Sequence, residues 1–179
     1  SEDRRGVGLL LDESLEWNVS FTLMQSQNKL LKNLLGGLIK WRDSKAIHAL
    51  TNQYIDELAI KCTGSQQKAR ELSGGNQQKI CLARAFALHP KFLFVSEPTR
   101  GIDVGAKDEI YTLLEDLAKQ GKAIIVISSE LPEVLRLANR IAVMAHGRII
   151  GTLNNEEATQ ENIMELATVG QEEANGEVA

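Results

Sequence analysis

The stretch LSGGNQQKICLARAFALHPKFLFVSEPTRGIDVGAK, residues 72–107, decides the fold of this chain. Its segment 74–88 has apolar residues near helical spacing and stops before Pro90, so it predicts a helix. The next residues, KFLFV at 91–95, form a short continuous apolar run, which is typical of a strand buried on both faces. The stretch therefore predicts a helix that leads directly into a buried strand.

The same alternation continues beyond this stretch. Residues 106–119 suit a helix that Gly121 ends, and KAIIVIS at 122–128 is a second apolar strand. A short helix is expected at 130–138, followed by two strands around a turn within 140–153. Apolar strands that alternate with helices predict an α/β fold, with a parallel sheet covered by helices on both faces.

Four regions are expected along the chain. Residues 1–13 form a short opening segment, and residues 14–71 form a mostly helical subdomain with a break at LLGGLIK, residues 34–40. Residues 72–155 hold the α/β core. Residues 156–179 predict an amphipathic helix followed by a polar, disordered tail.

Composition excludes several classes of function. The formal net charge of −4 argues against a broad nucleic-acid-binding surface, which needs a basic face. No apolar run approaches the roughly 18 residues of a membrane span, so contact with a membrane must come through a partner. Two cysteines and no secretory signal favour a reducing, cytoplasmic setting.

The start of the helix at 74 has an unusual composition. Each of Gly74 and Gly75 costs roughly 1 kcal/mol relative to alanine inside a helix. Ser73 is a good N-cap, and the N–H groups of the first turn could receive a phosphate that approaches bare backbone. An ordinary cap with two tolerated glycines explains the same residues, so both interpretations stay open.

The end of the strand carries a second group of polar residues. Ser96 and Glu97 lie where the chain leaves the sheet at Pro98, and ligands of parallel sheets bind at the carboxyl ends of strands. Glu97 could accept a proton from a water there, or it could be an ordinary solvated carboxylate. Asp103 could be the N-cap of the next helix.

Taken together, LSGGNQQK, EPTRGIDVGAK and SSELPEVL resemble the signature, Walker B and D-loop segments of ABC-type ATPases. They are most similar to the second nucleotide-binding half of bacterial importers for ribose, galactose, arabinose, xylose or autoinducers. The opening SEDRRGVGL resembles the Q-loop region of that half. The resemblance implies a P-loop-NTPase-like sheet with a helical subdomain.

In such families two nucleotide-binding domains meet head to tail, and each ATP lies between the P-loop of one domain and the signature of the other. The resemblance therefore implies a first nucleotide-binding domain, membrane permease subunits and, indirectly, a periplasmic or extracellular solute-binding protein as partners. It implies no nucleic acid. It implies ATP and Mg²⁺ as cofactors, and a peripheral position at the cytoplasmic face of the membrane. The signature residues that would contact ATP of the opposite domain are Leu72, Ser73, Gly74, Gly75, Asn76 and Gln77.

The same resemblance assigns roles beyond the strand. Glu97 matches the catalytic base that polarises the attacking water. Gly101 and Asp103 match the D-loop, which communicates across the dimer. Electrostatic positioning of the γ-phosphate would supply most of the catalysis.

Three positions depart from the family pattern. Ser96 replaces the Walker B aspartate that helps to hold Mg²⁺, and a hydroxyl is a weaker partner for that ion. Ser129 replaces the histidine of the switch, and the Q-loop glutamine aligns with Glu2. The sequence also contains no GxxxxGKS or GxxxxGKT phosphate-binding loop. The chain is therefore interpreted as a fragment of a longer ATPase, with the part that carries the P-loop missing, and is expected to be inactive in isolation.

Two other functions are alternatives to the importer ATPase. An ABC protein of the repair or translation type would act on nucleic acid, which the acidic charge opposes. A non-catalytic regulatory or structural half of an importer ATPase is favoured by Ser96 and Ser129.

Overall fold

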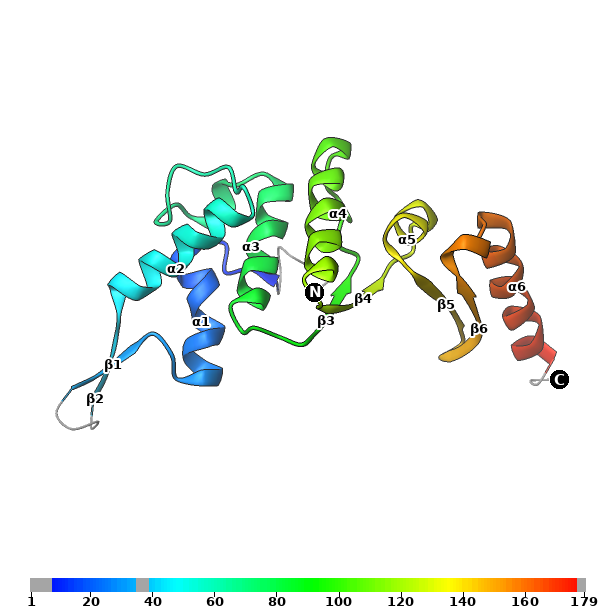
Figure 1. Ribbon diagram of the computed structural model, residues 1–179, viewed down its shortest axis with the longest axis horizontal. Helices are drawn as coiled ribbons and strands as arrows, with labels where there is room; N and C mark the ends of the chain where they lie inside the picture. The colour runs from blue at the N-terminus through cyan, green and yellow to red at the C-terminus, as the bar shows by residue number, and fades with distance from the viewer. Residues whose placement is uncertain (1–7, 35–38, 177–179) are drawn as a thin grey trace. The chain divides into compact units, whose positions relative to one another are not determined.

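The computed structural model describes residues 8–34 and 39–176, and the chain divides into two compact units, Ser1–Ile125 and Val126–Ala179 (Figure 1). The boundary between the units falls inside a strand. The predicted core, residues 72–155, is therefore divided between the two units, and each is described by itself.

The first unit begins with a helical part that contains a β-hairpin. Helix α1 (Leu15–Gln27) is followed by strands β1 (Leu31–Leu34) and β2 (Ile39–Arg42), and then by helix α2 (Ser44–Glu57). The two strands pair antiparallel. The predicted break at residues 34–40 lies between α1 and α2, with residues 35–38 outside the described part of the chain, and the strands on either side of it were not expected from the sequence.

The second part of the first unit has the predicted alternation of helices and strands. A short 3-10 helix η3 (Ala69–Glu71) leads to α3 (Gly74–Phe86), β3 (Phe92–Ser96) and α4 (Val104–Lys119), and β4 (Ala123–Ile127) follows. Strands β3 and β4 are neighbours in one sheet and are joined through α4, as in a βαβ unit. The α/β prediction is confirmed.

The burial of β3 differs from the prediction. Leu93 and Val95 are buried, but Phe92 and Phe94 are each 68% exposed. Side chains alternate between the two faces of a strand, and the described residues leave this second face of β3 uncovered. The expectation that the strand is buried on both faces is therefore wrong for the described part of the chain.

The core of the first unit is formed by α1, α2 and α3. Leu15, Val19 and Leu23 form the buried face of α1. Helical spacing in the sequence predicts an apolar row of Trp17, Phe21 and Met24, and of these only Met24 is buried. Trp17 and Phe21 are only half-buried, and their rings pack together with centroids 5.4 Å apart. The other buried members of this core are Leu9, Tyr54, Leu58, Ile60, Ala69, Leu72, Ile80, Ala83 and Ala87.

The second unit contains the helix α5 (Leu131–Leu137) and the antiparallel strands β5 (Arg140–Ala145) and β6 (Arg148–Asn154). The short 3-10 helix η4 (Asn155–Glu157) precedes α6 (Gln160–Gly176). The predicted pair of strands is confirmed.

The turn between β5 and β6 uses two left-handed residues, His146 at φ 48° and Gly147 at φ 75°. Behind the hairpin, Ile141, Val143 and Ile163 form the small core of this unit. Helix α6 continues to Gly176, whereas the sequence predicted disorder from residue 170. Glutamate, glutamine and alanine in this segment are good helix formers, and that propensity explains the difference.

A buried carboxylate connects α1 with α2 in the first unit. Glu16 is 5% exposed, and its Oε1 lies 2.8 Å from Nδ1 of His48 and accepts a hydrogen bond of 2.9 Å from Oγ of Ser65. Burial raises the pKa of Glu16, but hydrogen bonds from His48, Ser65 and Gln66 outweigh burial, so the pKa lies below its ordinary value of 4.5. The charged form of Glu16 is therefore the one that the fold stabilises.

This arrangement predicts a pH-dependent contribution to stability. A carboxyl whose pKa falls on folding stabilises the protein above its unfolded pKa, and the contribution disappears as the pH falls through the folded pKa. We expect Glu16→Gln to lower the free energy of unfolding by about 1 kcal/mol at pH 7, with the difference vanishing as the pH drops below 4.5. Urea denaturation across this range measures it. The exposed Glu13→Gln is the control, and an equal loss in both variants would contradict the prediction.

Candidate functional site

The signature turn, residues 73–76, lies at the start of α3. Ser73 occupies the N-cap in an extended conformation, with φ −62° and ψ 159°, and its side chain is exposed. The Ser73 hydroxyl makes no capping bond. Instead its Oγ accepts a hydrogen bond of 2.8 Å from Nδ2 of Asn76. The turn is therefore held by a side-chain bridge that leaves the serine at the surface.

The two glycines of this turn differ in environment. Gly74 is half-buried, whereas Gly75 is buried against α4. A Cβ added at Gly75 would lie 2.7 Å from Cβ of Ala106, which is closer than side chains can pack. Packing between α3 and α4 alone therefore requires glycine at position 75, and the composition of the turn is no evidence for an anion at that residue.

Two further residues of the predicted signature face inward. Leu72 is 7% exposed and belongs to the core. Gln77 is also buried, and its Nε2 donates hydrogen bonds of 3.2 Å to the carbonyl oxygens of Ala69 and Leu72. Both residues support the turn from behind, which leaves Ser73, Gly74 and Asn76 as its accessible part.

The end of β3 places Ser96 and Glu97 next to each other, and both are half-buried. Glu97 has a left-handed backbone with φ 48°, a conformation that residues other than glycine seldom adopt. The chain then turns inward, since Pro98 and Thr99 are buried and Oγ1 of Thr99 lies 3.4 Å from the hydroxyl of Tyr111. A buried anchor thus follows directly after the carboxylate.

The D-loop residues connect this anchor with α4. Gly101 has φ 66°, which favours glycine. Asp103 is the N-cap of α4, and its Oδ2 accepts a hydrogen bond of 3.1 Å from the backbone N–H of Ala106. The predicted capping role of Asp103 is confirmed. Its role across a dimer stays a prediction.

A lysine of the signature helix is buried at the interface with α4. Nζ of Lys79 lies 2.8 Å from Oε2 of Glu109 and donates a hydrogen bond of 3.0 Å to the carbonyl oxygen of Ala59. The hydrogen bond from Lys79, together with its positive charge, holds the pKa of Glu109 below its ordinary value of 4.5. The sequence does not predict this pair, because a single lysine in a helix gives no sign of burial.

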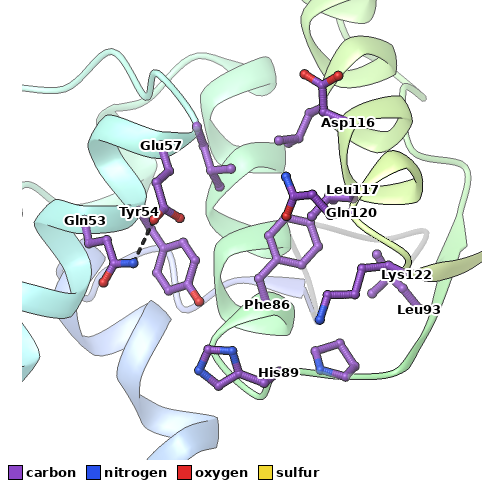
Figure 2. Close-up of a pocket in the computed structure, with 13 residues that line it drawn as sticks. Gln53, Tyr54, Glu57, Phe86, His89, Leu93, Asp116, Leu117, Gln120 and Lys122 are labelled. Carbon is purple, nitrogen blue, oxygen red and sulfur yellow. Dashed lines mark hydrogen bonds between the residues drawn. The ribbon is translucent and has the colours of Figure 1, made fainter.

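A cavity of about 560 Å³ lies in the first unit between α2, α3 and α4 (Figure 2). It is at the C-terminal end of α3, away from the signature turn. Figure 2 shows the rings of Tyr54 and Phe86 on its wall, together with the side chains of Asp116 and Lys122. Burial and then the negative charge of Glu57 raise the pKa of Tyr54 above its ordinary value of 10.0. The cavity contains none of the predicted site residues.

The ABC transporter family matches residues 4–100, slightly more than half of the chain. The chain belongs to this family. Solved ATP-binding cassettes of ABC transporters share its fold. One, in its ADP conformation, has a TM-score of 0.69 and 22% sequence identity over 88% of this chain and 63% of its own. Another, a dimeric cassette in a post-hydrolysis state bound to ADP and Pi, has a TM-score of 0.65 and 19% identity over 84% of this chain and 60% of its own.

Curated relatives of this ABC transporter chain include import ATP-binding proteins. The ribose import ATP-binding protein RbsA of Lactococcus lactis subsp. cremoris is 47% identical over 95% of this chain and 33% of its own length. A putative ribose/galactose/methyl galactoside import ATP-binding protein of Burkholderia lata is 48% identical over 94% of this chain and 31% of its own length. The chain thus spans about a third of the length of these relatives.

Two positions predicted from the resemblance, Ser129 and Glu2, are not part of the described first unit. Ser129 is exposed in the second unit, two residues after β4 ends, and is described only within that unit. Glu2 lies outside the described residues. In the described part of this ABC chain, no helix is long and apolar enough to cross a bilayer.

The donor atoms at the end of β3 do not form a magnesium site by themselves. Ser96 offers a neutral hydroxyl and Glu97 one carboxylate, whereas Mg²⁺ in such sites takes carboxylate oxygens together with substrate phosphates. Within residues 8–34 and 39–176, no group of three or more His, Cys, Asp or Glu side chains could hold a metal ion. Binding of Mg²⁺ by these residues stays a prediction of the resemblance.

Proposed function

We propose that this chain is part of the ATP-binding and ATP-hydrolysing subunit of an ABC importer for sugars or related small polar solutes. Its membership of the family carries the proposal, and the names of relatives at 47–48% identity support the solute class. The signature turn would bind the γ-phosphate of an ATP held by the P-loop of an opposing nucleotide-binding domain.

The geometry of the signature turn supports this role. The first N–H groups of a helix have no partners within the helix, and the helix dipole favours negative charge at this end. The exposed Ser73 and the half-buried Gly74 lie at this end of α3. Behind them, Gly75 and Gln77 fix the turn against α4 and the 3-10 helix. A turn that is rigid before ATP arrives loses little conformational entropy on binding.

The residues at the end of β3 would act on the attacking water. Glu97 would accept a hydrogen bond from this water and orient it toward the γ-phosphorus. The buried Thr99 and the cap at Asp103 hold the backbone that follows Glu97 in place. Positioning and electrostatic stabilisation, rather than covalent chemistry, are what the protein supplies in phosphoryl transfer.

The exposed part of the hairpin β1–β2 suits a permease contact. Trp41 is 68% exposed, although large aromatic side chains are usually well buried. Next to it, the guanidinium of Arg42 lies 4.5 Å from the ring centre of Trp17. In the complete transporter this surface would face cytoplasmic loops of the membrane subunits.

A second candidate function is a half that binds ATP without hydrolysing it. Ser96 and Ser129 favour it, because neither supplies the charge or the imidazole of the usual motif. Such a half would still present its signature turn to the opposite site.

The proposal is tested by changing the charge of the signature turn without weakening the helix. Asparagine and aspartate are both strong N-caps, so Ser73→Asn and Ser73→Asp should fold equally well. Aspartate adds a negative charge beside the phosphate, and we expect it to lower kcat/KM for ATP of the complete protein by about tenfold.

Ser73→Asn is the matched neutral variant, and we expect Ser73→Asp to hydrolyse ATP about tenfold more slowly than Ser73→Asn. Steady-state kinetics and thermal melts of both variants make the comparison. Equal hydrolysis by both variants would show that the signature turn does not face the γ-phosphate.

A further inference from the structure

Lys79 occupies an unusual position for a lysine. It lies one and a half turns into the signature helix, and its side chain is 4% exposed. Lysine is almost never buried unless its charge is paired. Here the charge is paired twice, by the carboxylate of Glu109 at 2.8 Å and by the carbonyl oxygen of Ala59 at 3.0 Å.

These contacts join three separate segments of the first unit. Lys79 belongs to α3, Glu109 belongs to α4, and Ala59 lies in the loop after α2 with a left-handed backbone at φ 46°. Figure 1 shows α3 and α4 side by side, and the contacts of their residues agree with this view. Lys79 thus links α3 by polar bonds to α4 and to the loop that follows α2.

The loop after α2 also reaches the signature turn itself. The backbone N–H of Lys61 donates a hydrogen bond of 2.9 Å to Oδ1 of Asn76, whose Nδ2 in turn bonds to Ser73. Nζ of Lys61 lies 3.9 Å from Oε1 of Glu109. The same short loop therefore holds Asn76 by one bond and Lys79 by another, and Glu109 lies within reach of both lysines.

Fold stability gives little reason for such a pair. Removing the Lys79 ammonium from water is costly. The Glu109 side chain that pairs with it is still 46% exposed, so solvent weakens the attraction that could offset this cost. What an ion pair with fixed hydrogen-bond geometry adds is a defined position of one helix relative to another. At this interface the two helices begin with the signature turn and the D-loop, and Gly75 already contacts Ala106 across it.

We propose that Lys79 and Glu109 are positioning residues that hold the signature turn in register with the D-loop and Glu97. In this role the pair acts through the placement of α3 against α4 and not through contact with the nucleotide or with the attacking water. This inference rests on the proposed function, since it assigns a purpose to the pair only if the signature turn and Glu97 serve ATP hydrolysis.

The test uses the complete ATPase subunit with its permease. Lys79→Met keeps much of the side-chain volume but removes the charge, and Lys79→Arg keeps the charge. Small displacements of catalytic groups cost large factors in rate, so we expect Lys79→Met to lower kcat for ATP by about tenfold, with KM for ATP changed much less. Lys79→Arg should restore most of the rate. Kinetics are compared at a temperature where melts show every variant fully folded.

Two further variants make the result specific. Glu109→Gln should lower kcat as Lys79→Met does, and the double variant should be no slower than either single one, because both break the same pair. Lys119→Met is the matched control. It breaks the exposed pair of Lys119 with Asp116, 2.9 Å apart on the same helix, and should leave kcat unchanged.

Each outcome has a definite meaning. If the fully folded Lys79→Met protein has normal kcat, or if the effects of Lys79→Met and Glu109→Gln multiply as independent losses, the positioning role is wrong. In that case, ATP hydrolysis by the unsubstituted protein would still support the proposed function. An unsubstituted subunit that hydrolyses no ATP would instead overturn the proposed function, and the role of the pair would fall with it.

Discussion

Glu97→Gln is expected to lower the rate of ATP hydrolysis by the complete protein about 10²- to 10⁴-fold, the usual contribution of a general base. The amide keeps the size of the side chain and can still donate or accept a hydrogen bond. It cannot take up a proton or carry the negative charge that orients the attacking water. Nucleotide binding should change little, because Glu97 would contact the water rather than the triphosphate.

The measurement is single-turnover hydrolysis, which separates chemistry from product release. Glu71→Gln is the control, since Glu71 is an exposed carboxylate next to the signature turn. Unchanged turnover in Glu97→Gln would show that this half binds ATP without hydrolysing it. The second candidate function would then replace the first.

Gly75→Ala is expected to lower the free energy of unfolding by about 2 kcal/mol, roughly a 30-fold change in the folding equilibrium. The added Cβ would lie 2.7 Å from Cβ of Ala106, so α3 and α4 must move apart. Alanine favours a helix over glycine by about 1 kcal/mol, and the predicted loss is what remains after this gain. Chemical denaturation of the chain measures it.

Two variants check the cause. At Gly105 in α4, the nearest atom to an added Cβ is Oδ2 of Asp103 at 3.8 Å, which is ordinary contact. Gly105→Ala should therefore stabilise the protein by about 1 kcal/mol. Combining Gly75→Ala with Ala106→Gly moves one methyl group across the contact and should recover most of the loss. A stabilised Gly75→Ala protein would show that the close approach of the helices is not tight.

The sequence predicted the parts of the fold that depend on local pattern. The helix that begins at Gly74 follows from an N-cap and helical spacing of apolar residues, and the strand β3 follows from an apolar run. The capping role of Asp103 could be predicted for the same reason, because a cap acts on the N–H groups two or three residues further on. Helix-start and strand-end chemistry indicate Ser73, Gly74, Gly75 and Glu97 as candidates, and the resemblance alone assigns their roles, which stay predictions.

The parts that were missed depend on contacts between distant segments. Strands β1 and β2 have only four residues each and include lysine, asparagine and arginine, so they show no alternating apolar pattern. The contact of Glu16 with Ser65 spans 49 residues. The burial of Lys79 depends on Ala59 and Glu109, which no periodicity connects with it. Only packing of the folded chain brings these groups together.

The left-handed backbone of Glu97 has a further consequence for how this position evolves. Glycine adopts such a conformation without penalty, and asparagine adopts it more readily than most residues, whereas glutamate is strained there. Selection for fold stability alone would favour glycine at position 97. A glutamate that persists there in a lineage is therefore retained despite a small loss of fold stability. A change to glycine would mark a half that no longer hydrolyses ATP.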